Sequence, residues 1–152
     1  MRVQGAAIGG GTDMALCSDI TVMADNARIG YPPVRVWGCP QTSMWVYRLG
    51  AERAKLLMLT GDLVDGRTAA AMGLVARSVP EEELDANVDA LANRIAGVPK
   101  NHLMIQKMVI NQAFDNMGLQ STQMMATVFD GITRHTPCTS RTVVRRSDSR
   151  PP

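Results

Sequence analysis

The sequence predicts an α/β fold followed by a helical region. Residues 1–75 are rich in Gly, Ala, Val, Ile and Met and place short apolar segments between glycines and prolines, which is typical of short strands alternating with short helices. Residues 76–135 repeat apolar side chains at helical spacing instead. The chain has 152 residues, 45% of them hydrophobic, which suffices for one globular domain with a core.

The α/β part divides into short elements bounded by glycine and proline. Residues 1–5 are predicted to end a strand, and Gly9-Gly10-Gly11 to form a tight turn into a helix over residues 12–17. Residues 20–24 are predicted to form a buried strand, and residues 28–31 another short one. Pro32 and Pro33 end that strand because proline has no backbone donor.

Three helices are predicted beyond residue 80. Glu81, Glu82 and Glu83 place negative charge in a first turn, where the helix dipole favours it. The apolar face of this first helix consists of Leu84, Val88, Leu91 and Ile95, and the helix ends at Gly97 and Pro99. The other two helices cover residues 101–116 and 119–133, and the apolar face of the last consists of Met125, Val128, Phe129 and Ile132.

This helical region is rich in methionine, with Met104, Met108, Met117, Met124 and Met125. Core packing by a flexible side chain is the favoured interpretation, and a surface that binds a partner or another subunit is the alternative. Residues 136–152 contain few apolar residues and many Arg, Ser, Thr and Pro, which predicts a disordered basic tail.

Composition excludes several classes of protein. The formal charge of +2 comes from tail arginines, so the body has no basic face for nucleic acid. Three distant cysteines, Cys17, Cys39 and Cys138, indicate no disulfide framework and favour a reducing, cytoplasmic setting. No apolar run is long enough to span a membrane, which predicts a soluble chain. His102 and His135 are isolated, and no pattern of metal ligands is visible.

The glycine turn is the first candidate for chemistry. It lies between an apolar strand end and a helix start, where backbone N–H groups can bind an anion or stabilise an oxyanion. Close packing of small residues is the alternative. A phosphate-binding P-loop would require Lys followed by Ser or Thr, but Thr12 and Asp13 follow the glycines, and the spacing does not fit a dinucleotide fingerprint.

Five motifs in order resemble the crotonase superfamily, the enoyl-CoA hydratase/isomerase family. They are Val-x-Gly-x-x-x-Gly-Gly-Gly at 3–11, Ser-Asp-Ile at 18–20, Ala-Arg-Ile-Gly-Tyr-Pro at 27–32, Leu-Thr-Gly at 59–61 and Ala-Met-Gly-Leu-Val at 71–75. The resemblance covers residues 2–135 and implies that residues 1–75 are the second part of a ββα superhelix whose N-terminal turns are missing. It further implies that residues 76–135 form a helical oligomerisation subdomain of a trimer or hexamer.

The resemblance also implies a substrate and a site. Members bind acyl-CoA thioesters of fatty acid metabolism and hold the thioester oxygen in an oxyanion hole of two backbone N–H groups. Gly10 matches one donor, and the other belongs to an earlier segment that this chain does not contain. By this resemblance Gly9, Gly10, Tyr31, Pro33 and Trp37 are the expected substrate-binding residues. No separate cofactor is expected, because coenzyme A is part of the substrate.

Family hydratases use two glutamates, and this chain has neither. Asp13 occupies the first position and is the candidate general acid or base, although its side chain is one methylene shorter. Pro33 occupies the second position and can transfer no proton. Tyr31 and Cys39 could be weak acids there, but pocket-shaping or core roles are favoured for both.

For the remaining polar candidates, a structural role is favoured over a catalytic or binding role. Asp19 is expected to cap a helix or bond backbone, Asp62 and Asp65 to stabilise the following turn and helix start, and Lys107 to lie on a solvated helix face in preference to a coenzyme A phosphate.

Two functions follow from the resemblance. One is a hydratase (a lyase) or isomerase acting on enoyl-CoA, with Gly10 as the oxyanion donor and Asp13 as the acid/base catalyst. The other is a non-catalytic acyl-CoA-binding or oligomerisation module, which Pro33 and the missing first half favour. The chain begins almost directly before the glycines, and it loses the resemblance after residues 135–137, which suggests a truncated or frame-shifted relative.

Overall fold

The computed structural model describes residues 1–135, so the predicted basic tail at residues 136–152 lies outside the described residues. The strands are β1 (Arg2–Val3), β2 (Ala6–Ile8), β3 (Val22–Ala24), β4 (Arg28–Gly30), β5 (Leu63–Asp65) and β6 (Arg77–Val79). The helices are α1 (Gly10–Cys17), α2 (Met44–Leu49), α3 (Ala51–Thr60), α4 (Gly66–Ala71), α5 (Leu84–Ala96), α6 (Lys100–Asn116) and α7 (Leu119–His135). Two 3₁₀ turns are η1 (Pro32–Arg35) and η2 (Glu81–Glu83).

The strands form two small sheets that stack successive turns of the chain. In the first sheet β1, β3 and β6 are all parallel, and in the second β2 is parallel to β4, which is antiparallel to β5. In the next turn of the chain, β3 pairs with β1 and β4 pairs with β2, so the two turns stack on each other. Helix α1 connects β2 to β3 along the chain. This arrangement confirms the predicted α/β class.

The predicted first strand is two strands in the structure. Gly5 has a φ of +71° and separates β1 from β2, a conformation that glycine adopts without the steric cost of a Cβ. Helix α1 begins at Gly10, earlier than predicted, because the glycines themselves take helical geometry. The three C-terminal helices agree with the apolar spacing, and α6 and α7 differ from the predicted bounds by one or two residues. Glu81, Glu82 and Glu83 form the 3₁₀ turn η2 before α5 and not the predicted first turn of that helix.

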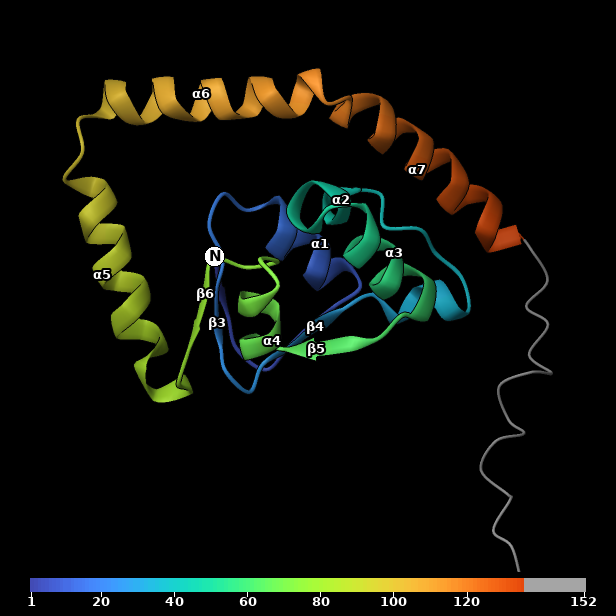
Figure 1. The fold of residues 1–152 in the computed structure, drawn as a ribbon, viewed down its shortest axis with the longest axis horizontal. Helices are drawn as coiled ribbons and strands as arrows, with labels where there is room; N and C mark the ends of the chain where they lie inside the picture. The colour runs from blue at the N-terminus through green and yellow to red at the C-terminus, as the bar shows by residue number, and fades with distance from the viewer. Residues whose placement is uncertain (136–152) are drawn as a thin grey trace, which may run out of the picture.

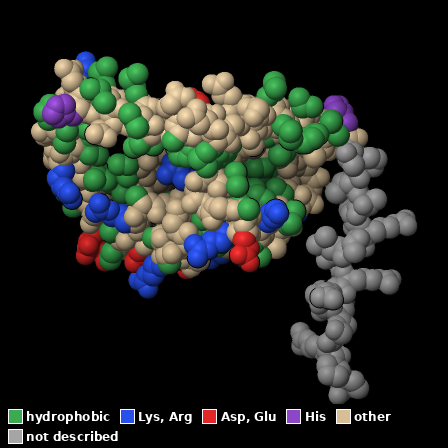
Figure 2. Space-filling view, turned by 45° about the horizontal axis from the view of Figure 1, so that its top comes forward, with side chains coloured by type: hydrophobic (Ala, Val, Ile, Leu, Met, Phe, Trp, Pro, Cys, Tyr) green, Lys and Arg blue, Asp and Glu red, His purple; other side chains and the backbone are tan. Residues whose placement is uncertain are grey.

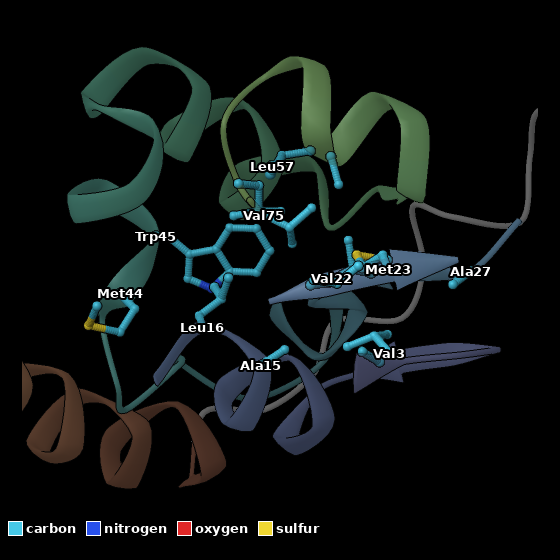
Figure 3. Packing of buried hydrophobic residues seen from close by; sticks show 14 of the residues in the cluster. Val3, Ala15, Leu16, Val22, Met23, Ala27, Met44, Trp45, Leu57 and Val75 are labelled. Atoms are coloured by element: carbon cyan, nitrogen blue, oxygen red, sulfur yellow. The ribbon is translucent and has the colours of Figure 1, made fainter. Parts of the chain in front are cut away.

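The core lies between the sheets and helices α1 to α4. Val22, Met23 and Ala24 of β3 are all buried, as expected for a strand covered on both faces. Trp45 points into this cluster from α2, and Leu57 and Val75 contribute from α3 and the segment before β6 (Figure 3). Burial of these side chains supplies the main driving force for the fold.

Helices α5, α6 and α7 form an arm around this body (Figure 1). Leu84 of α5 is fully buried against β1 and β3, whereas α6 has no buried residue, and α7 buries only Ala126 and Asp130. Large hydrophobic side chains are exposed on α6 and α7. Figure 2 shows hydrophobic side chains on both the arm and the body of this face. No helix within residues 1–135 combines the length and apolar character needed to cross a bilayer.

The methionine-rich region does not pack in the core of this chain. Its five methionines, Met104, Met108, Met117, Met124 and Met125, are each 52–68% exposed. The core-packing interpretation is therefore wrong for the described chain. Met104 and Met108 lie on α6, which has no buried residue. Met124 and Met125 lie on α7, which buries only Ala126 and Asp130.

Candidate active site

The glycine turn joins β2 to α1 at the edge where the parallel strands β2 and β4 end. Gly9 has a φ of +57°, and its N–H donates to the carbonyl of Gly30 at 3.3 Å. The hydroxyl of buried Thr12 lies 2.6 Å from the carbonyl oxygen of Ala7 and 2.7 Å from that of Gly30. The start of α1 is thus fixed to both strands.

Gly10 presents its backbone N–H at the N-terminus of α1. Within residues 1–135 this N–H has no acceptor, as expected for the first residue of a helix. A Cβ placed on Gly10 would meet no atom within 4 Å, so the space beside it is open. An unpaired N–H at the positive end of a helix dipole, with room beside it, can donate a hydrogen bond to a negatively charged oxygen.

Asp13 lies one helical turn after Gly10 and is half-buried. The hydroxyl of Thr42 donates to Asp13 Oδ1 at 2.6 Å. Burial raises the pKa of Asp13 above its ordinary value; the Thr42 bond opposes this rise, and the charge of Asp130 adds to it. A carboxyl whose pKa is raised holds its proton nearer to neutral pH, which suits a group that exchanges protons with a substrate.

Pro33 lies against the same turn: a Cβ placed on Gly9 would stand 3.6 Å from Pro33 Cγ. Tyr31 is buried, and burial together with the charges of Asp13 and Asp130 raises the pKa of its phenol. Trp37 lies farther along, 49% exposed, with the Arg134 guanidinium 4.8 Å from its ring centroid. The structure therefore brings Gly9, Gly10, Asp13 and Pro33 together, and Trp37 extends toward α7.

Asp130 is a residue of this site that sequence reasoning missed. It projects from α7, is 3% exposed, and accepts hydrogen bonds from Cys39 N, Gln41 Nε2 and Arg134 Nε at 2.8–3.0 Å. The Cys39 N–H, followed by the Arg134 side chain, lowers its pKa. A single acidic residue beside the apolar positions Val128, Phe129 and Ile132 was the sequence signal that could have identified it.

Two other sequence candidates pair with each other. Asp19 does not cap a helix; its Oδ2 lies 2.6 Å from the ammonium of Lys107, and both side chains are exposed. The prediction for Asp19 is wrong because α6 crosses above this junction and supplies a charged partner.

The structural roles predicted for Asp65 and Asp62 are confirmed. Asp65 caps α4, where it accepts a hydrogen bond from the Thr68 N–H at 2.8 Å. Asp62 forms an ion pair with Arg35 at 2.7 Å.

Two cavities lie elsewhere on the surface of the described residues. One, of about 510 Å³, lies between the 38–43 loop, α2, α3 and α7 and is mostly apolar, with Lys55 contributing. The other, of about 630 Å³, lies beside β4, β5 and α3. Gly10 and Asp13 line neither of them, so they face a different part of the surface.

Comparison with known proteins decides the family. The family model described as enoyl-CoA hydratase/isomerase matches residues 1–141. The chain belongs to the enoyl-CoA hydratase/isomerase family. A relative from Thermus thermophilus is 32% identical over an alignment 152 residues long that covers 99% of this chain and 60% of that protein. A crotonyl-CoA hydratase of Syntrophomonas wolfei is 34% identical over 78% of this chain and 45% of its own length.

Solved structures of this family confirm the crotonase-like fold. An enoyl-CoA hydratase from Mycobacterium smegmatis superimposes with a TM-score of 0.86 at 46% identity, over 89% of this chain and 48% of that one. One from Mycobacterium avium gives 0.73 at 30% identity, over 87% and 62%. The chain thus spans about half the length of the relatives it matches. The predicted resemblance is confirmed, while the roles of individual site residues stay predictions.

Proposed function

We propose that this chain supplies one side of an acyl-CoA thioester site and takes part in adding water to, or isomerising, an enoyl-CoA. The observation that carries the proposal is the unpaired Gly10 N–H at the start of α1, with the Asp13 carboxyl one helical turn away on the same helix. Family membership supports the substrate class.

In this proposal the Gly10 N–H donates to the thioester oxygen as negative charge develops on it. That interaction stabilises an enolate-like transition state more than the substrate, which is the requirement for catalysis. Asp13 exchanges the proton, as a general base when ionised and as a general acid when protonated. Because its pKa is raised, a larger fraction of Asp13 is protonated near neutral pH than of an exposed aspartate.

Pro33 favours a second candidate function, an acyl-CoA-binding or oligomerisation module without turnover. It stands beside Gly9 at the position where family hydratases have their second glutamate. Asp130 lies on the same side of Gly38 as Pro33: a Cβ at Gly38 would stand 3.4 Å from Pro33 Cβ and 3.7 Å from Asp130 Oδ1. The carboxylate of Asp130 already accepts three donors, so we do not assign it the role of that glutamate. Binding of crotonyl-CoA without hydration would distinguish this module from a catalyst.

The apolar outside of α6 and α7 supports a proposal of self-association. Exposed residues on these helices include Ile105, Val109, Phe129 and Ile132 along with the methionines. An apolar face of this extent is typical of subunit interfaces. The described cysteines, Cys17 and Cys39, are both free, which accords with the proposed cytoplasmic setting.

Replacing Gly10 with Ala is expected to weaken binding of crotonyl-CoA by about 10- to 100-fold while leaving the fold intact. The added methyl meets no protein atom, so stability changes little, but it occupies the space beside the proposed donor. An overpacking cost of roughly 1–3 kcal/mol corresponds to that loss of affinity. Equilibrium dialysis with crotonyl-CoA measures it.

Gly131→Ala on α7 is the matched control, because a Cβ there also meets nothing within 4 Å. It is expected to bind as the wild type does. Equal affinity in all three proteins would show that the thioester does not lie at Gly10.

A further inference from the structure

We propose that Gln123 of α7 is a positioning residue for Asp13, acting through Thr42. This inference rests on the proposed acid/base role of Asp13. Gln123 Nε2 donates to the backbone carbonyl of Thr42 at 3.0 Å, and the hydroxyl of the same Thr42 donates to Asp13 Oδ1 at 2.6 Å. Thr42 is thus the single residue that links Gln123 to the Asp13 carboxyl.

Thr42 needs an external support because its segment has little regular structure. Residues 36–43 connect η1 to α2 without a helix or strand, and Gly38 and Ser43 both have positive φ, at 118° and 53°. Inside the segment, one turn is closed by Ser43 N, which donates to the carbonyl of Pro40 at 3.1 Å. The carbonyl of Thr42 finds its partner outside the segment, on α7.

Helix α7 provides that support at both ends of the segment. Toward its start, Cys39 N and Gln41 Nε2 donate to the buried carboxylate of Asp130, and Gly38 N donates to Thr133 Oγ1 at 3.3 Å. Toward the end of the segment, Gln123 donates a hydrogen bond to the carbonyl of Thr42. Asp130 fixes the segment as a whole, whereas Gln123 fixes the residue that touches Asp13.

The charges around Asp13 make the Thr42 bond decisive. The titratable groups that face Asp13 are Cys17 of α1, Tyr31 and Cys39 of the following segments, and Asp130 of α7. Arg48, which acts on Cys17, and Arg134, which acts on Tyr31, bond to other groups. Arg48 donates to the carbonyls of Leu16 and Ser18, and Arg134 donates to Asp130. The Thr42 hydroxyl is therefore the contact that stabilises the ionised Asp13 and lowers its pKa.

Gln123→Ala is expected to raise the pKa of Asp13, because Thr42 loses its support and bonds the carboxylate less well. The measurement is a ¹³C NMR titration of the side-chain carboxyls in the full chain without substrate, with the Asp13 signal assigned from its absence in Asp13→Asn. Gln120→Ala is the matched control on the same helix: Gln120 is exposed and has no side-chain hydrogen bond in the described structure. An unchanged Asp13 titration in Gln123→Ala would overturn the proposal.

A double-mutant cycle separates positioning from general stability. Thr42→Val removes the hydroxyl and is expected to raise the Asp13 pKa, and Thr42→Ser, which keeps it, is expected to restore the wild-type titration. In the Thr42→Val background Gln123→Ala should cause no additional shift, because the link is already broken. Additive shifts would mean that Gln123 acts on Asp13 by another route, which contradicts the proposal. The titration requires no turnover, so its outcome is independent of whether crotonyl-CoA binds.

Discussion

Asp13→Asn is expected to lower the rate of crotonyl-CoA hydration by roughly 10²- to 10⁴-fold, the usual contribution of a positioned acid/base group. Asparagine fills the same volume and still accepts the Thr42 hydrogen bond, but it cannot take up or release the proton. The loss should therefore fall on kcat, with little change in the affinity for crotonyl-CoA. Loss of the enoyl-thioester absorbance gives the rate.

Asp115→Asn provides the control, because Asp115 is an exposed carboxylate on α6 that is remote from the site. The stability of Asp13→Asn offers a second check. Burial raises the pKa of Asp13, so its ionisation opposes folding above the ordinary aspartate pKa and has no such effect at lower pH. Asp13→Asn should thus be no less stable than the wild type at neutral pH. Unchanged turnover in a folded variant would remove Asp13 from the mechanism.

Gly30→Ala is expected to reduce the free energy of unfolding by about 3 kcal/mol, the upper end of typical overpacking costs. A Cβ at Gly30 would stand 2.5 Å from the carbonyl oxygen of Asp62 and 2.7 Å from Leu63 Cδ2. Strands β4 and β5 would have to separate, because the nearest atom belongs to the backbone. The Gly30 carbonyl also accepts from Gly9 and Thr12, so the glycine turn would shift and crotonyl-CoA binding would weaken.

Urea unfolding followed by circular dichroism measures this effect. Gly131→Ala, in the open interior of α7, should be neutral or stabilising by up to about 1 kcal/mol. If Gly30→Ala unfolds at the wild-type urea concentration, the close approach of β4 and β5 is not required for the fold.

The sequence predicted the elements up to β4 and the three C-terminal helices because their signals are local, whereas α2, α3, β5 and β6 were not predicted. Apolar spacing predicted α5, α6 and α7, and the glycines followed by an apolar segment predicted the turn into α1. The family motifs then directed attention to Gly10 and Asp13, which the structure places on one helix. Both kinds of prediction succeeded for residues that are close together in the sequence, such as Gly10 and Asp13.

The residues that support Asp13 could not be found in the same way. Thr42, Gln123 and Asp130 meet only because α7 returns to the body after the long α6, and no periodicity encodes that return. The exposure of Met104 and Met108 was hidden for the converse reason: their spacing indicates an apolar face but does not show what covers it.

Calorimetric titration of the folded chain with crotonyl-CoA, at two temperatures, tests the central claim most directly. Free coenzyme A is the control, because it lacks the thioester carbonyl that Gly10 is proposed to bind. The account predicts saturable heat with crotonyl-CoA, weaker binding of free coenzyme A, and loss of the difference in Gly10→Ala. Absence of heat at both temperatures, in a chain whose circular dichroism shows the fold, would contradict a thioester site on this chain.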